Sequence, residues 1–179
     1  MANLKSFTGI FALALLMVAL PSCKKEGCTN PIADNYDSDA KDDDGTCIFK
    51  GCTDMLADNY DSLANEENGS CIYPSEQFLG NFDGTDACGT ETESYFMNIS
   101  AVAGDVTKVS LNDFAGWDEN VQATATNSGG SYLLNINDTQ GGKTFDGSGA
   151  LNGSSLIINY TVTDDTGELT CTSNLIKQP

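Results

Sequence analysis

The 179-residue sequence contains no histidine and no arginine. It therefore lacks the side chain that most readily transfers protons near neutral pH, which is also the commonest metal ligand. Its eight basic residues are all lysines and stand against 26 acidic residues, so the formal net charge is −18. Such a charge repels nucleic acids and anionic lipid surfaces. The composition excludes nucleic acid as an expected partner and favours cationic or metal-bridged ones.

Motifs for catalysis are also missing from the sequence. No Gly-x-Ser-x-Gly nucleophile motif occurs, and no histidine is present to act as the base for a serine or threonine. The glycine-rich stretch "GSGALNG" at 147–153 lies between expected strands and precedes no expected helix, so phosphate binding is not expected there. We therefore predict that the protein is not an enzyme.

The N-terminus has an apolar run from Ile10 to Leu20. The run is shorter than the roughly 20 apolar residues that span a bilayer, but it suits a signal-peptide core. The following "LPSC", which ends at Cys23, resembles a bacterial lipobox. This resemblance implies a signal peptide over 1–22, a lipidated N-terminus over 23–26 and acyl chains on Cys23 that anchor the protein to a membrane. An ordinary secreted protein is the alternative.

The residue after Cys23 is Lys24, and the aspartate associated with inner-membrane retention is absent. The lipoprotein pattern therefore points to the outer membrane, with the protein at the cell surface or on the periplasmic face.

Seven cysteines are present, and six remain if Cys23 carries lipid. An even number in an oxidising compartment indicates disulfides. Residues 27–49 and 51–73 align without gaps and are identical at 13 of 23 positions, so the simplest pairing lies within each repeat. The predicted bonds are Cys28–Cys47, Cys52–Cys71 and, by default, Cys88–Cys171. A bond from Cys47 to Cys52 is the alternative, whereas zinc is not expected without histidine or paired Cys-x-x-Cys motifs.

Each repeat is acidic and has few apolar residues, so burial alone cannot offset the entropy lost on ordering its backbone. A disulfide across about 20 residues adds about 3 kcal/mol to the stability of the folded repeat in the chain-entropy model. Crowded carboxylates would be relieved by Ca²⁺, which takes six to eight oxygen ligands, although the spacing is not that of an EF-hand. A solvated acidic loop is the alternative to a calcium site. The predicted calcium ligands are Asp34, Asp37, Asp39, Asp42, Asp44, Asp58, Asp61, Glu66 and Asn68.

The repeats resemble the "GCTDxxAxNYDxxAxxDDGSC" modules of cell-surface and secreted proteins of Bacteroidota, especially of flavobacterial relatives. The resemblance covers residues 27–73 and implies an extracytoplasmic, disulfide-bonded spacer or adhesion repeat without catalytic activity. Met55 departs from the module, which usually has proline at that position.

Residues 77–179 are predicted to form an antiparallel eight-stranded β-barrel or β-sandwich, because short alternating apolar runs are separated by turn signals. Alternation is clear where Leu156, Ile158, Tyr160 and Val162 share one face. The half also resembles small β domains that follow such repeats in Bacteroidota lipoproteins, which implies a lipocalin-like or sandwich fold. The expected strands are 77–82, 93–102, 106–114, 121–126, 132–137, 143–151, 156–163 and 168–176.

Aromatic residues of this half are expected in its core. These residues are Phe96, Phe114, Tyr132 and Tyr160. Trp117 is expected to cap the core, with a platform for stacking carbohydrate as the alternative.

Taken together, the sequence predicts a mainly β, non-enzymatic outer-membrane or cell-surface lipoprotein. In this prediction, a disulfide-stabilised stalk presents a β domain to a surface glycan or a neighbouring protein. A lipocalin-like carrier is one alternative, and it requires an apolar interior cavity of about 300 Å³ or more. A calcium-dependent adhesin is the other.

Overall fold

A computed structural model describes residues 24–179, which divide into two compact units after Cys47. The predicted signal peptide and the lipidation site at Cys23 lie outside the described residues. Within residues 24–179, no helix is both long and apolar enough to cross a membrane.

The first unit contains the first repeat up to Cys47, and this segment has almost no regular structure. Strands β1 (Glu26–Gly27) and β2 (Asp42–Asp43) form a two-residue parallel pair. The disulfide Cys28–Cys47 closes the loop, and the buried side chains are those of Cys28 and Ala33. The remaining order comes from turns, in which backbone amides bond to nearby carbonyl and side-chain oxygens.

The second repeat, in the second unit, reproduces this arrangement with β3 (Lys50–Gly51) parallel to β4 (Glu66–Glu67) and the disulfide Cys52–Cys71. The same internal bonds recur. The side-chain amide of Asn35 donates to the backbone carbonyl of Thr46 at 2.7 Å, and the side-chain amide of Asn59 donates to the backbone carbonyl of Ser70 at 2.6 Å. The two copies therefore share a fold as well as a sequence.

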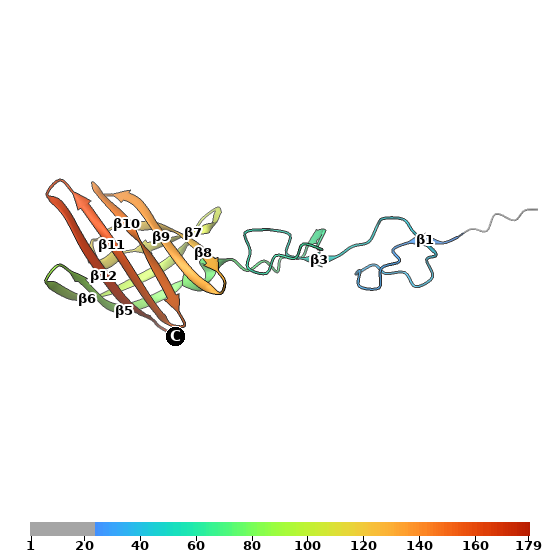
Figure 1. Cartoon of the computed structure of the whole chain (residues 1–179), viewed down its shortest axis with the longest axis horizontal. Coiled ribbons are helices and arrows are strands. Elements are labelled where there is room, and N and C mark those ends of the chain that lie inside the picture. Colours follow the sequence, from blue (N-terminus) through green and yellow to red (C-terminus); the bar gives the residue numbers. More distant parts are fainter. Residues whose placement is uncertain (1–23) are drawn as a thin grey trace, which may run out of the picture. The chain divides into compact units, whose positions relative to one another are not determined.

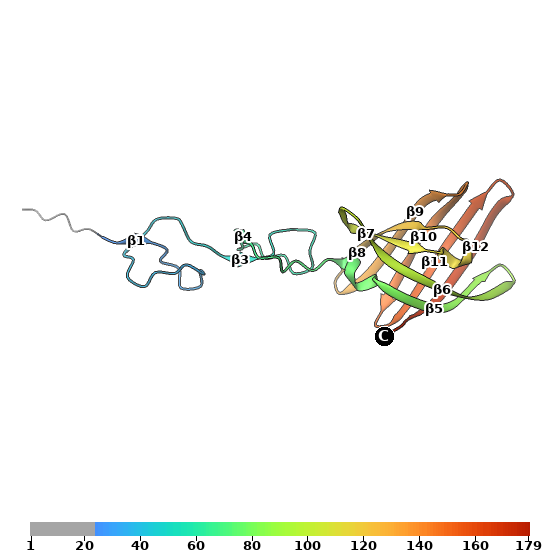
Figure 2. The same ribbon diagram turned by 180° about the vertical axis from the view of Figure 1, so that it is seen from behind.

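Eight antiparallel strands follow and close into a barrel, so the barrel alternative of the sequence prediction is confirmed (Figures 1 and 2). Each strand pairs with its neighbours in the chain, and β12 pairs with β5 to close the ring. The strands are β5 (Gly80–Cys88), β6 (Glu91–Val102), β7 (Asp105–Asn112), β8 (Val121–Ser128), β9 (Ser131–Gln140), β10 (Lys143–Asn152), β11 (Ser155–Asp164) and β12 (Gly167–Lys177).

Two short 3₁₀ helices belong to opposite ends of the barrel. Helix η1 (Pro74–Phe78) leads into β5 and buries Phe78, while η2 (Phe114–Gly116) lies in the β7–β8 connection and buries Phe114. Because the barrel is an up-and-down meander, the β5–β6, β9–β10 and β11–β12 turns lie at the same end as η2. We call these the η1 end and the η2 end.

Alternating side chains fill the barrel interior, as the period of two along a strand requires. On β11, Leu156, Ile158, Tyr160 and Val162 are all buried, and the residues between them are exposed or half-buried. Gly147 of β10 faces inward beside Tyr160, where an added Cβ would lie 2.6 Å from the Cβ of Tyr160. A side chain at this position is therefore excluded.

Three details of the sequence prediction are wrong. The first strand begins at Gly80 instead of residue 77, because Pro74 starts a 3₁₀ helix that takes in Phe78. The strand expected over 106–114 ends at Asn112, so Phe114 belongs to η2. Phe96 is 52% exposed and lies outside the core, because its neighbour Met97 takes the inward position on β6.

Candidate functional site

The predicted calcium ligands are occupied by turns and lysines in the structure. Asp37 accepts an ion pair from Lys25 at 2.7 Å and a hydrogen bond from the Asp39 amide at 2.9 Å. The pKa of Asp37 is held below its ordinary value, first by Lys25 and then by that amide. Lys25 also lies 3.8 Å from Asp39. Both carboxylates are thus already engaged by Lys25.

The same use of carboxylates continues through both repeats. Asp44 accepts hydrogen bonds from the hydroxyl and the amide of Thr46, and both lower its pKa. In the second repeat, the Glu67 carboxylate accepts hydrogen bonds from the backbone amide and hydroxyl of Thr53 and from the backbone amide of Gly69. The other predicted ligands with a described bond or ion pair are Asp42 with Lys24, Glu66 with Lys50, Asp58 with Asn127, Asp61 with the amide of Leu63, and Asn68 with the amide of Ser70.

Two groups of acidic and sulfur side chains do meet within residues 24–179, but neither is the predicted calcium set. Glu67 lies beside Cys52 and Cys71, and Asp86 lies beside Cys88 and Cys171. In both groups, the sulfur atoms belong to disulfides and are not thiolate ligands. Asp34, which the prediction also included, has partners of its own. Calcium binding by the repeats stays a prediction.

A polar network lies inside the barrel toward the η2 end. Asp86 is 7% exposed and accepts hydrogen bonds from the hydroxyl of Tyr160 at 2.9 Å and from that of Ser173. The indole nitrogen of Trp117 donates to the same Tyr160 oxygen at 3.1 Å. Tyr160 also packs against Phe114, with ring centroids 4.7 Å apart. Trp117 is therefore fixed at the barrel end, where it caps the core as predicted.

Burial dominates the electrostatics of the tyrosines in this region. Desolvation raises the pKa of Tyr160 well above its ordinary range, and the negative charge of Asp86 acts in the same direction. Burial likewise raises the pKa of Tyr95. Both hydroxyls therefore stay neutral at physiological pH. The Tyr160 hydroxyl bonds to Asp86 and Trp117, whereas the Tyr95 hydroxyl is buried without a hydrogen-bond partner among the residues that the structure describes.

The middle of the barrel is filled by large side chains that are less than 2% exposed. A packed interior of this kind is typical of small barrels whose strands point side chains at the axis. The fully buried large residues are Phe78, Phe82, Phe114, Phe145, Met97, Ile99, Leu111, Leu134, Ile136, Leu156, Ile158 and Leu175.

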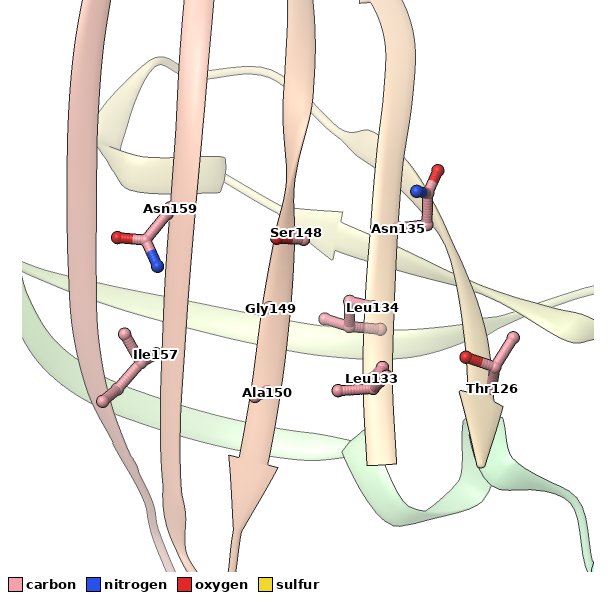
Figure 3. A pocket seen from close by; sticks show the side chains of 9 residues that line it. All are labelled: Thr126, Leu133, Leu134, Asn135, Ser148, Gly149, Ala150, Ile157 and Asn159. Atoms are coloured by element: carbon pink, nitrogen blue, oxygen red, sulfur yellow. The ribbon is translucent and has the colours of Figure 1, made fainter. Parts of the chain in front are cut away.

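The largest hollow described, of about 490 Å³, lies on the outer face of the barrel over strands β8 to β11 (Figure 3). It follows β10, where the outward residues Ser148 and Ala150 are small. In the strand register, Ser148 lies between Asn135 and Asn159, and Ala150 lies between Leu133 and Ile157. Thr126 of β8 completes the wall beyond Leu133. We call these residues the β10 hollow.

The β10 hollow has two chemically distinct levels, which Figure 3 shows one above the other. One level offers the carboxamides of Asn135 and Asn159 on either side of the Ser148 hydroxyl. The other offers the apolar side chains of Leu133 and Ile157 on either side of Ala150. No lining residue is charged, although the chain carries a net charge of −18. The hollow therefore suits a neutral ligand with both polar and apolar surface.

The sequence contained the residues of the β10 hollow but not the signal that brings them together. Leu133 and Ile157 looked like ordinary residues of alternating strands, and they are 36% and 43% exposed. Two apolar positions flanking a small residue become visible only when the register of three strands is known. The stretch "GSGALNG" is identifiable from the sequence only as a glycine-rich segment without a following helix.

Comparison with known proteins adds little to this description. Neither a family model nor a curated protein matches the chain. Among solved structures, the zebrafish ileal bile acid-binding protein complexed with cholic acid is similar at 12% sequence identity and a TM-score of 0.29, over 56% of this chain and 98% of its own. A superposition at this level carries no weight, so the fold assignment depends on the strand pairing.

Proposed function

We propose that this protein is a non-enzymatic outer-membrane lipoprotein that binds a neutral glycan through the β10 hollow. In this proposal, Cys23 carries the lipid and the two disulfide-clamped repeats form the stalk between the lipid and the barrel. The observation that supports glycan binding is an uncharged hollow on a heavily acidic protein, in which two asparagines flank a serine in the strand register.

The chemistry of the hollow matches a sugar ring. A carboxamide both donates and accepts hydrogen bonds, so Asn135 and Asn159 can each engage neighbouring hydroxyls. The side-chain oxygen of Asn159 already accepts a hydrogen bond from the Thr172 hydroxyl at 3.0 Å. This bond fixes the orientation of the carboxamide and leaves its NH₂ group available to a ligand. The C–H face of a sugar can pack on Leu133, Ala150 and Ile157. An anion or a metal ion would find no opposite charge among the lining residues.

A carrier function inside the barrel is less well supported, because the large inward side chains are fully buried and pack against one another. An adhesin that depends on calcium remains a prediction of the acidic repeats alone.

A serine-to-phenylalanine substitution in the β10 hollow tests the proposal, and the same change on a distant strand is its control. Ser148→Phe places a ring in the middle of the β10 hollow. Ser94→Phe places the same ring on the outer face of β6, which is four strands from β10 in either direction around the ring. The full chain in detergent micelles would be applied to an array of neutral oligosaccharides, and circular dichroism would confirm that both variants fold.

The expected result is that the wild type and Ser94→Phe bind the same oligosaccharides, while Ser148→Phe binds them at least about tenfold more weakly. The proposal fails if the wild type binds no neutral glycan on the array, or if Ser148→Phe retains full affinity. Binding of a fatty-acid probe that Ser148→Phe leaves unchanged would support the carrier alternative instead.

A further inference from the structure

Two further hollows, separate from the β10 hollow, lie at the η2 end. One, of about 240 Å³, is lined by parts of β5, β6 and η2, and the other, of about 250 Å³, by the ends of β11 and β12. Trp117 and Leu169 contribute to the walls of both. The indole and the leucine therefore stand between two neighbouring cavities.

Trp117 is held firmly enough to form such a wall. Its indole nitrogen is bonded to Tyr160, which is itself bonded to the buried carboxylate of Asp86. The backbone segments before and after Trp117 are joined by a hydrogen bond from the backbone amide of Phe114 to the carbonyl of Glu119 at 2.9 Å. The hydrogen bond to Tyr160 therefore fixes the orientation of the ring that the two cavities share.

The two cavities carry charge of one sign. Their lining residues include five acids and no base. Asp86, Glu91 and Glu93 line the first cavity, while Asp164 and Glu168 line the second. Asp164 is held ionised, because hydrogen bonds from the hydroxyl and amide of Thr166 lower its pKa.

The nearby lysine does not neutralise these acids. Lys143 at the start of β10 is paired with Glu119 at 3.4 Å, and it is a wall residue of neither cavity. The positive charge of Lys143 also lowers the pKa of Asp164, but less than the hydrogen bonds from Thr166 do. The local charge facing the cavities is therefore strongly negative.

We propose that the η2 end is a docking site for a basic peptide segment of a partner protein, which places one lysine or arginine side chain on each side of Trp117. A cation over an indole face gains from the negative face of the ring, and carboxylates around it add to the attraction. The site is independent of glycan binding at the β10 hollow.

Size favours a peptide over a single small molecule. Pockets for drug-sized ligands measure about 300–1,000 Å³, and each of these cavities falls below that range. A long, flexible basic side chain has an apolar stem, which can pack on Leu169, and a charged head, which can meet the carboxylates. Two such side chains on one backbone match two cavities that share a wall.

The lone tryptophan of the chain makes the site directly observable, because all indole fluorescence comes from Trp117. We would titrate the full chain in neutral detergent micelles with capped peptides that contain two arginines at increasing separation. Matched peptides would replace one or both arginines with citrulline, which keeps the shape and removes the charge. Glu93→Gln and Glu168→Gln each neutralise one cavity, and Glu76→Gln in η1 removes the same charge at the other end of the barrel.

The expected result is a change in Trp117 fluorescence with at least one two-arginine peptide and none with the double-citrulline peptide. The single-citrulline peptide, Glu93→Gln and Glu168→Gln should each weaken binding by at least about tenfold, whereas Glu76→Gln should have little effect. Added salt should also weaken binding.

The proposal would be overturned by no fluorescence change with any two-arginine peptide, by equal binding of the double-citrulline peptide, by an equal loss of affinity in Glu76→Gln, or by a Ca²⁺-induced change that blocks the peptides. Self-association abolished by Glu93→Gln would assign the site to a second copy of this chain and would also overturn it.

Discussion

Removal of the barrel disulfide should destabilise the β domain strongly without changing its fold. Cys88 and Cys171 are register partners on β5 and β12, the two strands that close the ring. They are 83 residues apart in sequence. In the chain-entropy model, a closed loop of this size contributes about 4.5 kcal/mol at 25 °C. The β12–β5 hydrogen bonds remain in a double alanine variant, so we expect the barrel to form but to open more readily.

The loss can be compared with the stability of an ordinary domain, which is about 5–15 kcal/mol. For a domain of about 100 residues, a loss of 4–5 kcal/mol corresponds to a fall in Tm of roughly 20 °C or more. The variant Cys88→Ala/Cys171→Ala would be unfolded in urea at 25 °C, with Trp117 fluorescence reporting on the η2 end and far-ultraviolet circular dichroism reporting on the strands.

The control for this experiment is Cys28→Ala/Cys47→Ala, which removes a disulfide of sequence separation 19 from the other compact unit. We expect its barrel transition to match that of the wild type. The reasoning is refuted if the barrel variant loses less than about 1 kcal/mol, which is within the range of an ordinary surface or conservative change. It is also refuted if the control loses as much.

Two further predictions concern the tyrosines and the lipid. Burial raises the pKa of Tyr95 and Tyr160, so both stay neutral in the folded barrel, while in the unfolded chain they ionise near pH 10. The contribution of these tyrosines to the free energy of unfolding should therefore be fully present below about pH 10. Above that pH it should fall, by about 1.4 kcal/mol per pH unit for Tyr160. Tyrosinate absorbance should show late ionisation that Tyr160→Phe reduces, and a single normal step for all six tyrosines would contradict this. Intact mass should show a chain cut before Cys23 and acylated there, with six further cysteines that alkylate only after reduction; alkylation without reduction would contradict the bonding.

Much of the barrel could be predicted because its strands alternate. On β11, polar residues separate Ile158, Tyr160 and Val162, so both the strand and its inner face were readable. The repeat made the cysteine pairing readable in the same way: it assigned equivalent positions to Cys28 and Cys52, and the structure has the bonds predicted within each copy.

Other features could not be read because they depend on contacts between distant residues. Phe96 and Met97 are adjacent and both apolar, so local sequence does not decide which of them points inward. The choice between a barrel and a sandwich depends on whether β12 pairs with β5, a contact between the two ends of the domain. The β10 hollow requires the register of three strands, and the paired cavities at Trp117 require the β7–β8 connection to fold over the barrel end.

The two repeats have a consequence for how such a protein can change over generations. In each copy, the aspartate amide bonds to the first cysteine carbonyl at 2.9 Å, for Asp37 with Cys28 and for Asp61 with Cys52. The disulfide of each copy also stays within that copy. An in-frame gain or loss of one such 24-residue segment would leave the internal bonding of the others intact. Tandem duplication or deletion can thus change the number of repeats without altering the bonds inside each remaining copy.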